Sequence, residues 1–238
     1  MSNLIKTDSG VTMIYESRTS ARFEIDSIQS GFGSVVGKSL SHILLGLLDG
    51  FAVIGFKIEG VEHEFSSIKG VVDNVSEIAM SLKQIRFKKL NNKNEKILIK
   101  YEGNEKFTAG DISKFTKNYE ILNPELVIFN CDSFVSLNIE LMIGFGSVYQ
   151  SAEDNAGKVD VKGMIFIDAI FSPVLDVQYK IEKYFIEKHK NYESLVIDIT
   201  TDGSIDPKDA LINACKLLKK CNSLMANVIS SIKTISID

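Results

Sequence analysis

The chain has 238 residues, of which 27 are Lys or Arg and 31 are Asp or Glu, so its formal net charge is −4. With 45% apolar and 24% charged residues, it has the composition of an ordinary globular protein of one large or two small domains. Three His, three Cys, three Arg and no Trp exclude a Cys/His zinc scaffold, a disulfide framework and an Arg-rich nucleic-acid surface.

No segment of the sequence is typical of export or of a membrane span. Residues 1–15 lack an apolar stretch and include Asp8, which is unlike a signal peptide. No run approaches the roughly 18 continuous apolar residues of a membrane-spanning helix. The three cysteines are odd in number and far apart, which favours reduced thiols. We therefore expect a cytoplasmic protein.

The first fifty residues predict a strand followed by a helix. Residues 22–26 alternate polar and apolar, as a half-buried strand does. Gly31 and Gly33 then break the chain. A helix over 32–48 is predicted by one apolar stripe, made of Phe32, Val36, Leu40, Ile43, Leu44 and Leu47. We expect Asp49-Gly50 to end this helix through a residue with positive φ.

The middle of the chain is rich in predicted strands. From Ala52 the period becomes two, which predicts a strand with Ala52, Ile54, Phe56 and Ile58 on one face, continued after a turn by residues 61–65. A helix is expected over 74–83 with Asp73 as its N-cap. Further strands are predicted over 85–90, 97–101, 126–131, 135–143 and 164–171, separated by turns at 91–94, 103–104 and 132–133.

The last third returns to mixed structure. Strands are predicted over 174–185 and 194–200, joined by the polar segment 187–193. A helix then begins with Asp206 as N-cap and Pro207 at its first position. Its apolar stripe is formed by Ala210, Ala214, Leu217, Cys221 and Leu224, with Leu211, Leu218 and Met225 beside it. This helix and the one over 32–48 have more apolar surface than one core contact needs, which indicates a subunit interface.

One arrangement imitates a nucleotide site. A strand leads to Gly31-x-Gly33-x-x-x-Gly37, then to a helix and to a second strand ending at Glu59, which outlines a dinucleotide-binding unit. The glycine spacing is wrong by one residue, and antiparallel-looking strands follow. We therefore expect the glycines to serve a tight turn before a packed helix; an oxidoreductase would instead have to bind NAD(P).

The histidines suggest no catalytic centre. His63 lies between Glu62 and Glu64, but strand alternation places it on the opposite face from both, so a solvated strand residue is favoured over a metal or acid–base site. His42 is predicted on the polar side of the first helix, and His189 in a charged loop.

The cysteines and lysines also have simple interpretations. Cys215 and Cys221 are six apart on a helix and are expected to be buried small apolar residues. The lysine-rich runs at 83–89 and 183–190 are expected to be solvated faces in this acidic chain. No catalytic residue and no metal ligand is predicted.

Several strings resemble the N-terminal domain of the bacterial RNA polymerase alpha subunit. They occur in the order of that family: Arg22-Phe23, Gly31-Phe32-Gly33, residues 37–40 and 43–45, 58–66, Gly70-Val71, Leu82-Lys83, 108–112, Asn123-Pro124, Ser172-Pro173-Val174, Tyr179 and 201–211. They extend from Arg22 to Leu218, nearly the whole chain, and together they are specific.

The resemblance implies an α+β fold with discontinuous domains. Residues 1–51 and 171–238 would form an αβ dimerisation domain, and 52–170 an inserted, mostly β domain. The family's C-terminal DNA-binding domain is absent from this sequence, so no direct DNA binding and no membrane binding is expected.

The resemblance also implies a non-catalytic subunit of a nucleotidyltransferase. The chain would pair with a second alpha, the same or a paralogue, and scaffold the beta and beta-prime subunits at the nucleoid. It would hold no cofactor, since another subunit holds the Mg of the polymerase. The expected dimer interface consists of Phe32, Val36, Leu40, Ile43, Leu44, Leu47, Ala214, Leu217, Leu218, Cys221 and Leu224.

The implied contacts with beta and beta-prime are Ser41, His42, Leu45, Lys83 and Ile167. At the first two positions the family usually has an arginine pair, and a histidine does not supply that forked, permanently charged donor. Since Lys83 and Ile167 correspond to beta-prime contacts, the chain would be the beta-prime-side member of an alpha heterodimer. An ordinary homodimer, and a dimeric interaction module acting outside polymerase, stay open as alternatives.

Overall fold

The computed structural model describes residues 10–90, 96–103, 105–158, 161–186 and 190–230. It is a mixed α+β chain with antiparallel strand pairs, as the sequence predicts. Contacts among its own residues divide the chain into two compact units. Unit 1 takes the residues up to Leu48, Val174–Thr201 and the residues from Asp206 on; unit 2 takes Asp49–Pro173 and Asp202–Ile205. The division falls three residues from the positions expected from the sequence, at 51/52 and 170/171.

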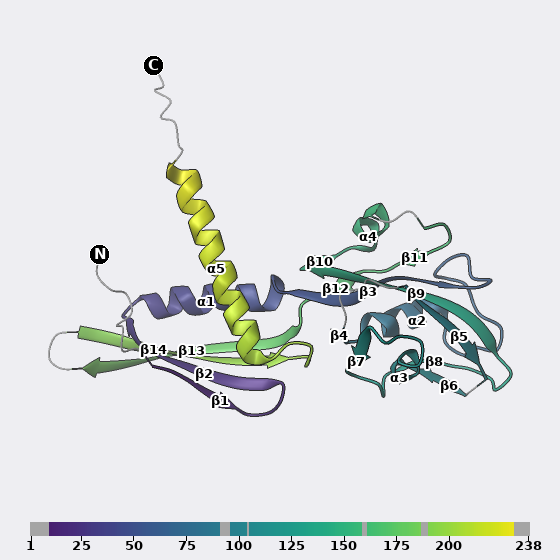
Figure 1. Cartoon of the computed structure of the whole chain (residues 1–238), viewed down its shortest axis with the longest axis horizontal. Coiled ribbons are helices and arrows are strands. Elements are labelled where there is room, and N and C mark those ends of the chain that lie inside the picture. The colour runs from purple at the N-terminus through teal and green to yellow at the C-terminus, as the bar shows by residue number, and fades with distance from the viewer. Residues whose placement is uncertain (1–9, 91–95, 104, 159–160, 187–189, 231–238) are drawn as a thin grey trace, which may run out of the picture. The chain divides into compact units, whose positions relative to one another are not determined.

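Unit 1 is a four-stranded antiparallel sheet with two helices. The sheet order is β1 (Val11–Tyr15), β2 (Ser20–Gln29), β14 (Lys190–Thr201) and β13 (Val174–Ile186). Helix α1 (Phe32–Gly46) packs against β13, β14 and β2, and α5 (Pro207–Ser230) crosses α1 and runs on past it (Figure 1). Strand β1, whose side chains are almost all exposed, was not predicted from the sequence.

The core of unit 1 lies between the sheet and α1. Phe23 of β2 and Leu195 and Ile199 of β14 are at most 2% exposed, as are Leu40 and Leu44 of α1. Helix α1 lies so close to the sheet that position 37 is occupied by glycine, because a Cβ there would lie 2.7 Å from the Tyr179 ring. The glycines therefore serve a turn before a packed helix, as expected.

A buried carboxylate holds the start of α1. Gly31 precedes the helix with φ of 95°, and no side chain at that position caps it. Instead Glu193 of β14, only 4% exposed, accepts a hydrogen bond from Gly33 N at 3.2 Å and one from Ser30 Oγ at 3.1 Å. A negative charge at a helix N-terminus is stabilising, so Glu193 ties α1 to the sheet.

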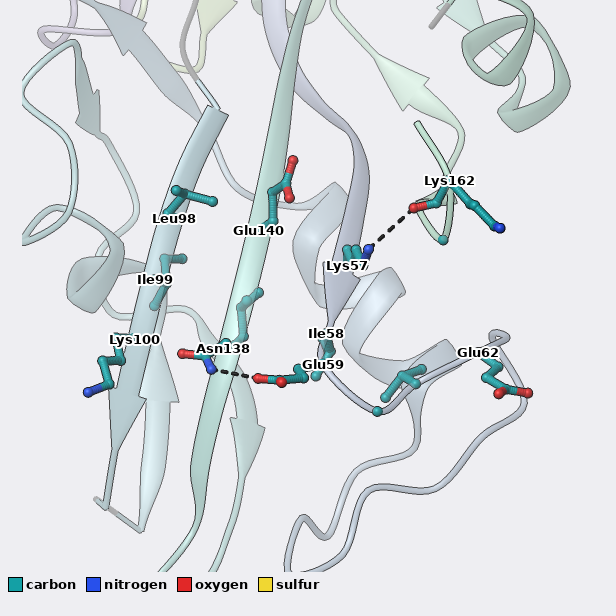
Figure 2. Close-up of a pocket in the computed structure, with 14 residues that line it drawn as sticks. Lys57, Ile58, Glu59, Glu62, Leu98, Ile99, Lys100, Asn138, Glu140 and Lys162 are labelled. Atoms are coloured by element: carbon teal, nitrogen blue, oxygen red, sulfur yellow. Dashed lines mark hydrogen bonds between the residues drawn. The ribbon is translucent and has the colours of Figure 1, made fainter. Parts of the chain in front are cut away.

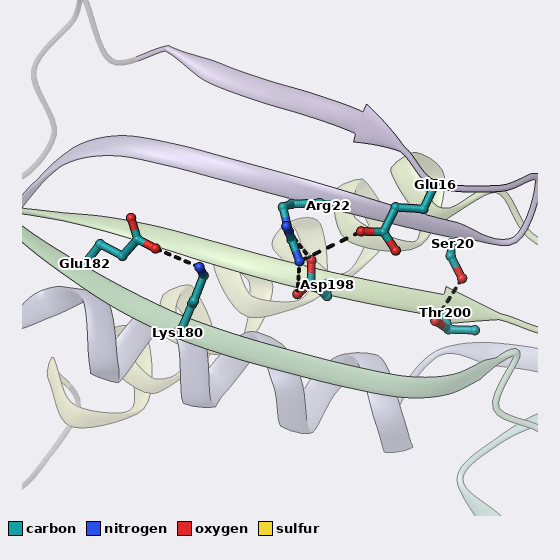
Figure 3. A network of polar contacts seen from close by, with 7 residues as sticks. All are labelled: Glu16, Ser20, Arg22, Lys180, Glu182, Asp198 and Thr200. Atoms are coloured by element: carbon teal, nitrogen blue, oxygen red, sulfur yellow. Dashed lines mark hydrogen bonds and ion pairs between the residues drawn. The ribbon is translucent and has the colours of Figure 1, made fainter.

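The sheet face of unit 1 that carries Arg22 is polar (Figure 3). Arg22 on β2 lies directly opposite Asp198 on β14, and its Nε and Nη2 donate to the two carboxylate oxygens at 2.7 and 3.0 Å. Lys180 and Glu182 form a second ion pair at 2.7 Å on β13. The cross-strand fork fixes the register of β2 on β14.

Unit 2 is built around the four-stranded sheet β11-β3-β9-β5, with small strand pairs β4–β7, β6–β8 and β10–β12. The strands are β3 (Asp49–Ile58), β4 (Phe87–Lys89), β5 (Lys96–Glu102), β6 (Lys106–Thr108), β7 (Tyr119–Ile121), β8 (Val127–Asn130), β9 (Ser136–Ser147), β10 (Tyr149–Gln150), β11 (Ile165–Phe166) and β12 (Ala169–Ile170). Its helices are α2 (Val75–Lys83), α3 (Ala109–Ile112) and α4 (Ala152–Lys158). The middle region is β-rich, as expected, but several of these short elements were not predicted, and the strand expected over 164–171 is two short ones.

Strand β3 corrects the predicted alternation. Val53, Phe56 and Ile58 belong to the main core, whereas Ala52 and Ile54 belong to a smaller cluster with Phe171. The pairing with β9 shifts between Val53 and Gly55, and such a bulge moves the following side chains to the other face. The prediction that Ala52, Ile54, Phe56 and Ile58 share one face was therefore wrong.

The end of α1 also differs from the prediction. The helix ends at Gly46, where the Leu47 N–H donates to Ile43 O at 2.9 Å, and Asp49 and Gly50 already belong to β3. Gly50 has no positive φ. It is required by a close approach instead, because a Cβ there would lie 1.9 Å from the backbone oxygen of Phe171.

Two local predictions around α2 were wrong. Residues 61–65 form no strand; His63 lies in an exposed turn, where its Nδ1 is 3.2 Å from Ser66 Oγ. The N-cap of α2 is Asn74, in a reciprocal capping box with Glu77, while Asp73 accepts from Asn130 N at 2.6 Å. The start of α5 is confirmed, since Asp206 Oδ1 accepts from Lys208 N at 2.8 Å.

Some sequence predictions fall where the structure gives no description. The turn expected at 91–94 lies wholly outside the described residues, as do His189 and the first part of the polar segment 187–193. The last part of that segment lies in β14, which begins at Lys190.

We expect Glu193→Gln to lower the free energy of unfolding by about 1–3 kcal/mol, because an amide group then faces the N–H and O–H donors at the start of α1. Urea unfolding of the whole chain measures this. The matched control is Glu182→Gln, since Glu182 is 58% exposed and its solvent-screened ion pair should contribute little to stability. Equal losses in the two variants would contradict the role of Glu193.

We expect Gly50→Ala to lower the free energy of unfolding by about 3 kcal/mol, because the added methyl group meets a backbone oxygen that cannot rotate away. Gly46→Ala is the control, as nothing lies within 4 Å of a Cβ there and alanine favours the helix. Urea unfolding should therefore show a loss only for the first variant; a stable Gly50→Ala chain would disprove the close approach.

Candidate functional site

The apolar stripe expected on α1 is divided between core and surface. Leu40, Ile43 and Leu44 are 1%, 6% and 0% exposed, so the chain itself covers them. Phe32 and Leu47 are 40% and 42% exposed, and Val36 is half-buried. In the single chain these three side chains therefore belong to the core of unit 1, and the other apolar residues of α1 are left at its surface.

Helix α5 shows the same division along its length. Ala214 is fully buried, and Leu217 and Leu218 are half-buried. From Lys219 to Ser230 every residue is exposed. Cys215 and Cys221 are exposed as well, so the expectation that they are buried was wrong, whereas Cys131 is buried. Partial burial raises the pKa of the Cys215 thiol.

An apolar stripe therefore remains uncovered on the C-terminal half of α5. It consists of Leu217, Cys221, Leu224 and Val228, with Met225 and Ile229 beside it, and we call it the α5 stripe. Leu224, Val228, Met225 and Ile229 are 54–64% exposed. The spacing of four, three and four residues keeps one helix face apolar. The stripe expected from the sequence ends at Met225, whereas the apolar face continues to Ile229.

A shallow apolar groove of about 520 Å³ lies between α1 and α5. It is lined by Val36, Leu40, Cys215, Leu218, Lys219, Asn222, Ser223 and Ala226. The groove and the α5 stripe use different faces of α5. Unit 1 thus offers both a projecting apolar helix and a recess that an apolar side chain can enter.

The residues expected to contact beta and beta-prime lie in both units. On α1, His42 is exposed, Leu45 is 44% exposed and Ser41 is half-buried. In unit 2, Lys83 ends α2 and forms an ion pair with Asp168 at 3.0 Å. Ile167 is only 4% exposed and belongs to the main core of unit 2.

An open pocket of about 880 Å³ lies in unit 2. Figure 2 shows Leu98, Asn138 and Glu140 on β5 and β9, with Lys57 and Lys162 at its other side. Its polar groups bind one another: Lys57 Nζ donates to Lys162 O at 3.3 Å, and Asn138 Nδ2 donates to Glu59 Oε2 at 2.6 Å. The described lining includes no serine, cysteine or histidine, so it presents no nucleophile paired with a base.

The start of α1 is unsuited to a nucleotide. A phosphate would have to occupy the N-terminus of the helix, where the Glu193 carboxylate already accepts the Gly33 N–H. Over the described part of the chain, no three His, Cys, Asp or Glu side chains gather in a way that could hold a metal ion. Among the same residues, no helix is long and apolar enough to cross a membrane.

Comparison with known proteins points in one direction. A model of the RNA polymerase Rpb3/RpoA insert domain matches residues 56–172. The DNA-directed RNA polymerase subunit alpha of Flavobacterium psychrophilum is 45% identical over 218 residues, which cover 91% of this chain and 66% of the relative. That of Cytophaga hutchinsonii is 46% identical over 199 residues, 83% of this chain and 60% of the relative.

A more distant relative covers the chain as well. The DNA-directed RNA polymerase subunit alpha of Prosthecochloris aestuarii is 36% identical over 229 residues, 90% of this chain and 70% of the relative. The chain spans 60–66% of the length of the first two relatives. The resemblance seen in the sequence is confirmed: the chain belongs to the family of DNA-directed RNA polymerase alpha subunits.

Proposed function

We propose that the chain is an alpha subunit that dimerises through unit 1 and scaffolds the beta and beta-prime subunits of a bacterial RNA polymerase in the cytoplasm. The observation that carries the proposal is the α5 stripe, which projects beyond the cover of its own unit. Exposed apolar surface on this scale marks an interaction site. In a symmetric dimer each protomer must carry both complementary features of the interface, and the groove between α1 and α5 supplies a recess in the same unit as the stripe.

The proposal assigns no chemistry to the chain itself. The described residues present neither a nucleophile–base pair in the large pocket nor a metal-binding cluster. Nucleotide transfer and its Mg would then belong to the subunits that the dimer holds. In this proposal the two chain ends dimerise, and residues of both units contact the large subunits.

We further propose that this alpha takes the beta-prime side of a heterodimer. His42 is exposed on α1, where the family usually carries the second arginine of a pair. A guanidinium binds a carboxylate through two parallel hydrogen bonds, which an imidazole cannot do. Lys83, the residue that corresponds to a beta-prime contact, is present and partly exposed.

We expect Leu224→Asp and Val228→Asp to weaken the dimer by about 100-fold, because a partner would bury an unpaired carboxylate on the α5 stripe. Sedimentation equilibrium of the whole chain measures the dissociation constant. Lys216→Asp is the control: it places the same side chain on an exposed position of α5 outside the stripe and the groove. A dimer unaffected by both stripe variants would contradict the proposed interface.

Reconstitution with beta and beta-prime tests the function and the heterodimer together. When the chain is the only alpha present, we expect it to bind beta-prime but to give incomplete polymerase. We expect the double variant Ser41→Arg/His42→Arg to increase the affinity for beta about tenfold or more. Mass spectrometry of the intact complex reports the partners. Full assembly by the unmodified chain alone would disprove the heterodimer, and failure to bind either large subunit would favour an interaction module outside polymerase.

A further inference from the structure

The two helices of unit 1 carry basic side chains and almost no acidic ones. Helix α1 contains Lys38 but no Asp or Glu. From Ala210 on, α5 contains Lys216, Lys219 and Lys220, again with no Asp or Glu. The chain as a whole has more acidic than basic residues, 31 against 27, so these helices differ in charge from the rest of the protein.

Two of the lysines border the surfaces proposed for the dimer. Lys219 lines the groove between α1 and α5. Lys220 precedes Leu224 by four residues, one helical turn, so it lies beside the α5 stripe. Both lysines are exposed. Each of the two complementary surfaces therefore has a positive charge at its edge.

The described residues of unit 1 do not neutralise these charges. Neither Lys219 nor Lys220 forms an ion pair with a described residue. Asp198 and Glu182 form their ion pairs on the polar face of the sheet (Figure 3), and Glu193 is buried where it accepts hydrogen bonds at the start of α1. A partner, however, can supply the opposite charge.

A second copy of this chain would instead bring like charges together. In a two-fold dimer, the α5 stripe of one protomer enters the groove of its partner, and the same contact is made in reverse. Lys220 beside the stripe then approaches Lys219 at the edge of the opposite groove, twice in the dimer. Like charges across an interface lower its affinity and suppress the wrong partner. The apolar stripe still favours self-association, so the homodimer is weakened and not abolished.

We propose that Lys219 and Lys220 determine which alpha this chain pairs with: they disfavour a second copy and favour a different alpha subunit that carries carboxylates beside the same stripe and groove. The inference rests on the proposed function and deepens it, because it bases the heterodimer on residues other than Ser41 and His42. Charge complementarity carries it, since neither helix offers an acidic side chain beside the stripe or the groove. Continuity with the proposed dimer surface identifies the occupant as an alpha subunit.

Mixing the wild-type chain with the variant Lys219→Glu/Lys220→Glu tests the proposal, because the variant carries the carboxylates expected of the partner. The two chains are combined in equal amounts, one of them labelled with heavy nitrogen, and the dimers are counted by native mass spectrometry. At about 0.05 M NaCl, mixed dimers should far exceed the half that random pairing gives, with a Kd about tenfold below that of either homodimer. At about 1 M NaCl, where charges are screened within about 3 Å, pairing should approach random.

Two further variants serve as controls. Lys219→Gln/Lys220→Gln removes the charges and keeps polar side chains, so its homodimer should be about tenfold tighter than that of the wild type at low salt and should no longer tighten as salt is raised. Lys208→Glu makes the charge reversal at an exposed position in the first turn of α5, outside the stripe and the groove, and should pair randomly with the wild type. If the glutamate variant fails to fold, the salt dependence of the wild type and of the glutamine variant decides the question.

Each contrary outcome overturns a stated claim. Random pairing of the wild type with a folded glutamate variant at low salt, or a wild-type homodimer that does not tighten as salt is raised, would overturn the charge selection alone and leave the proposed dimer intact. A wild-type chain that stays monomeric at every salt concentration and in every mixture would overturn the proposed dimer as well.

Discussion

The pairing of β2 with β14 is the constraint on which unit 1 depends. It brings together residues as far apart as Ser20 and Thr200, 180 positions along the chain, and the Arg22–Asp198 fork fixes its register. Loop-closure entropy grows only slowly with length, so the whole of unit 2 can be inserted between these strands at modest cost. Without this pairing, α1 and α5 would have no common sheet to pack on.

The same pairing carries the group that orients α1. Glu193 lies on β14 and reaches the N-terminus of a helix that follows β2, so the position of α1 depends on both strands. Once α1 is fixed, its inner side chains are covered and α5 can cross it. The surplus apolar surface is then concentrated on the free half of α5, which is the basis of the proposed dimer.

Unit 2 is organised differently, and this difference suits a separate role. Its core is continuous, with large side chains from β3, β9, α2 and the small strand pairs, and it buries even Ile167. Its exposed apolar side chains come from separate loops and strands, among them Phe65, Val72, Leu98 and Phe134, and not from one long helix stripe.

The sequence by itself determined the α+β class, the α1 and α5 helices, the β-rich middle and the family, because periodicity, the Asp206-Pro207 helix start and the shared strings are local signals. Only the tertiary structure decided the face of each β3 residue, since the bulge after Val53 is set by pairing with β9. It likewise decided why Gly50 is glycine, because a distant backbone approaches it. Above all, it decided which apolar residues are core, such as Leu40, Leu44 and Ile167, and which are exposed on the single chain, such as Leu224 and Val228. A stripe of apolar residues indicates that one face of a helix is buried, but only the packed fold shows whether the same chain or a partner buries it.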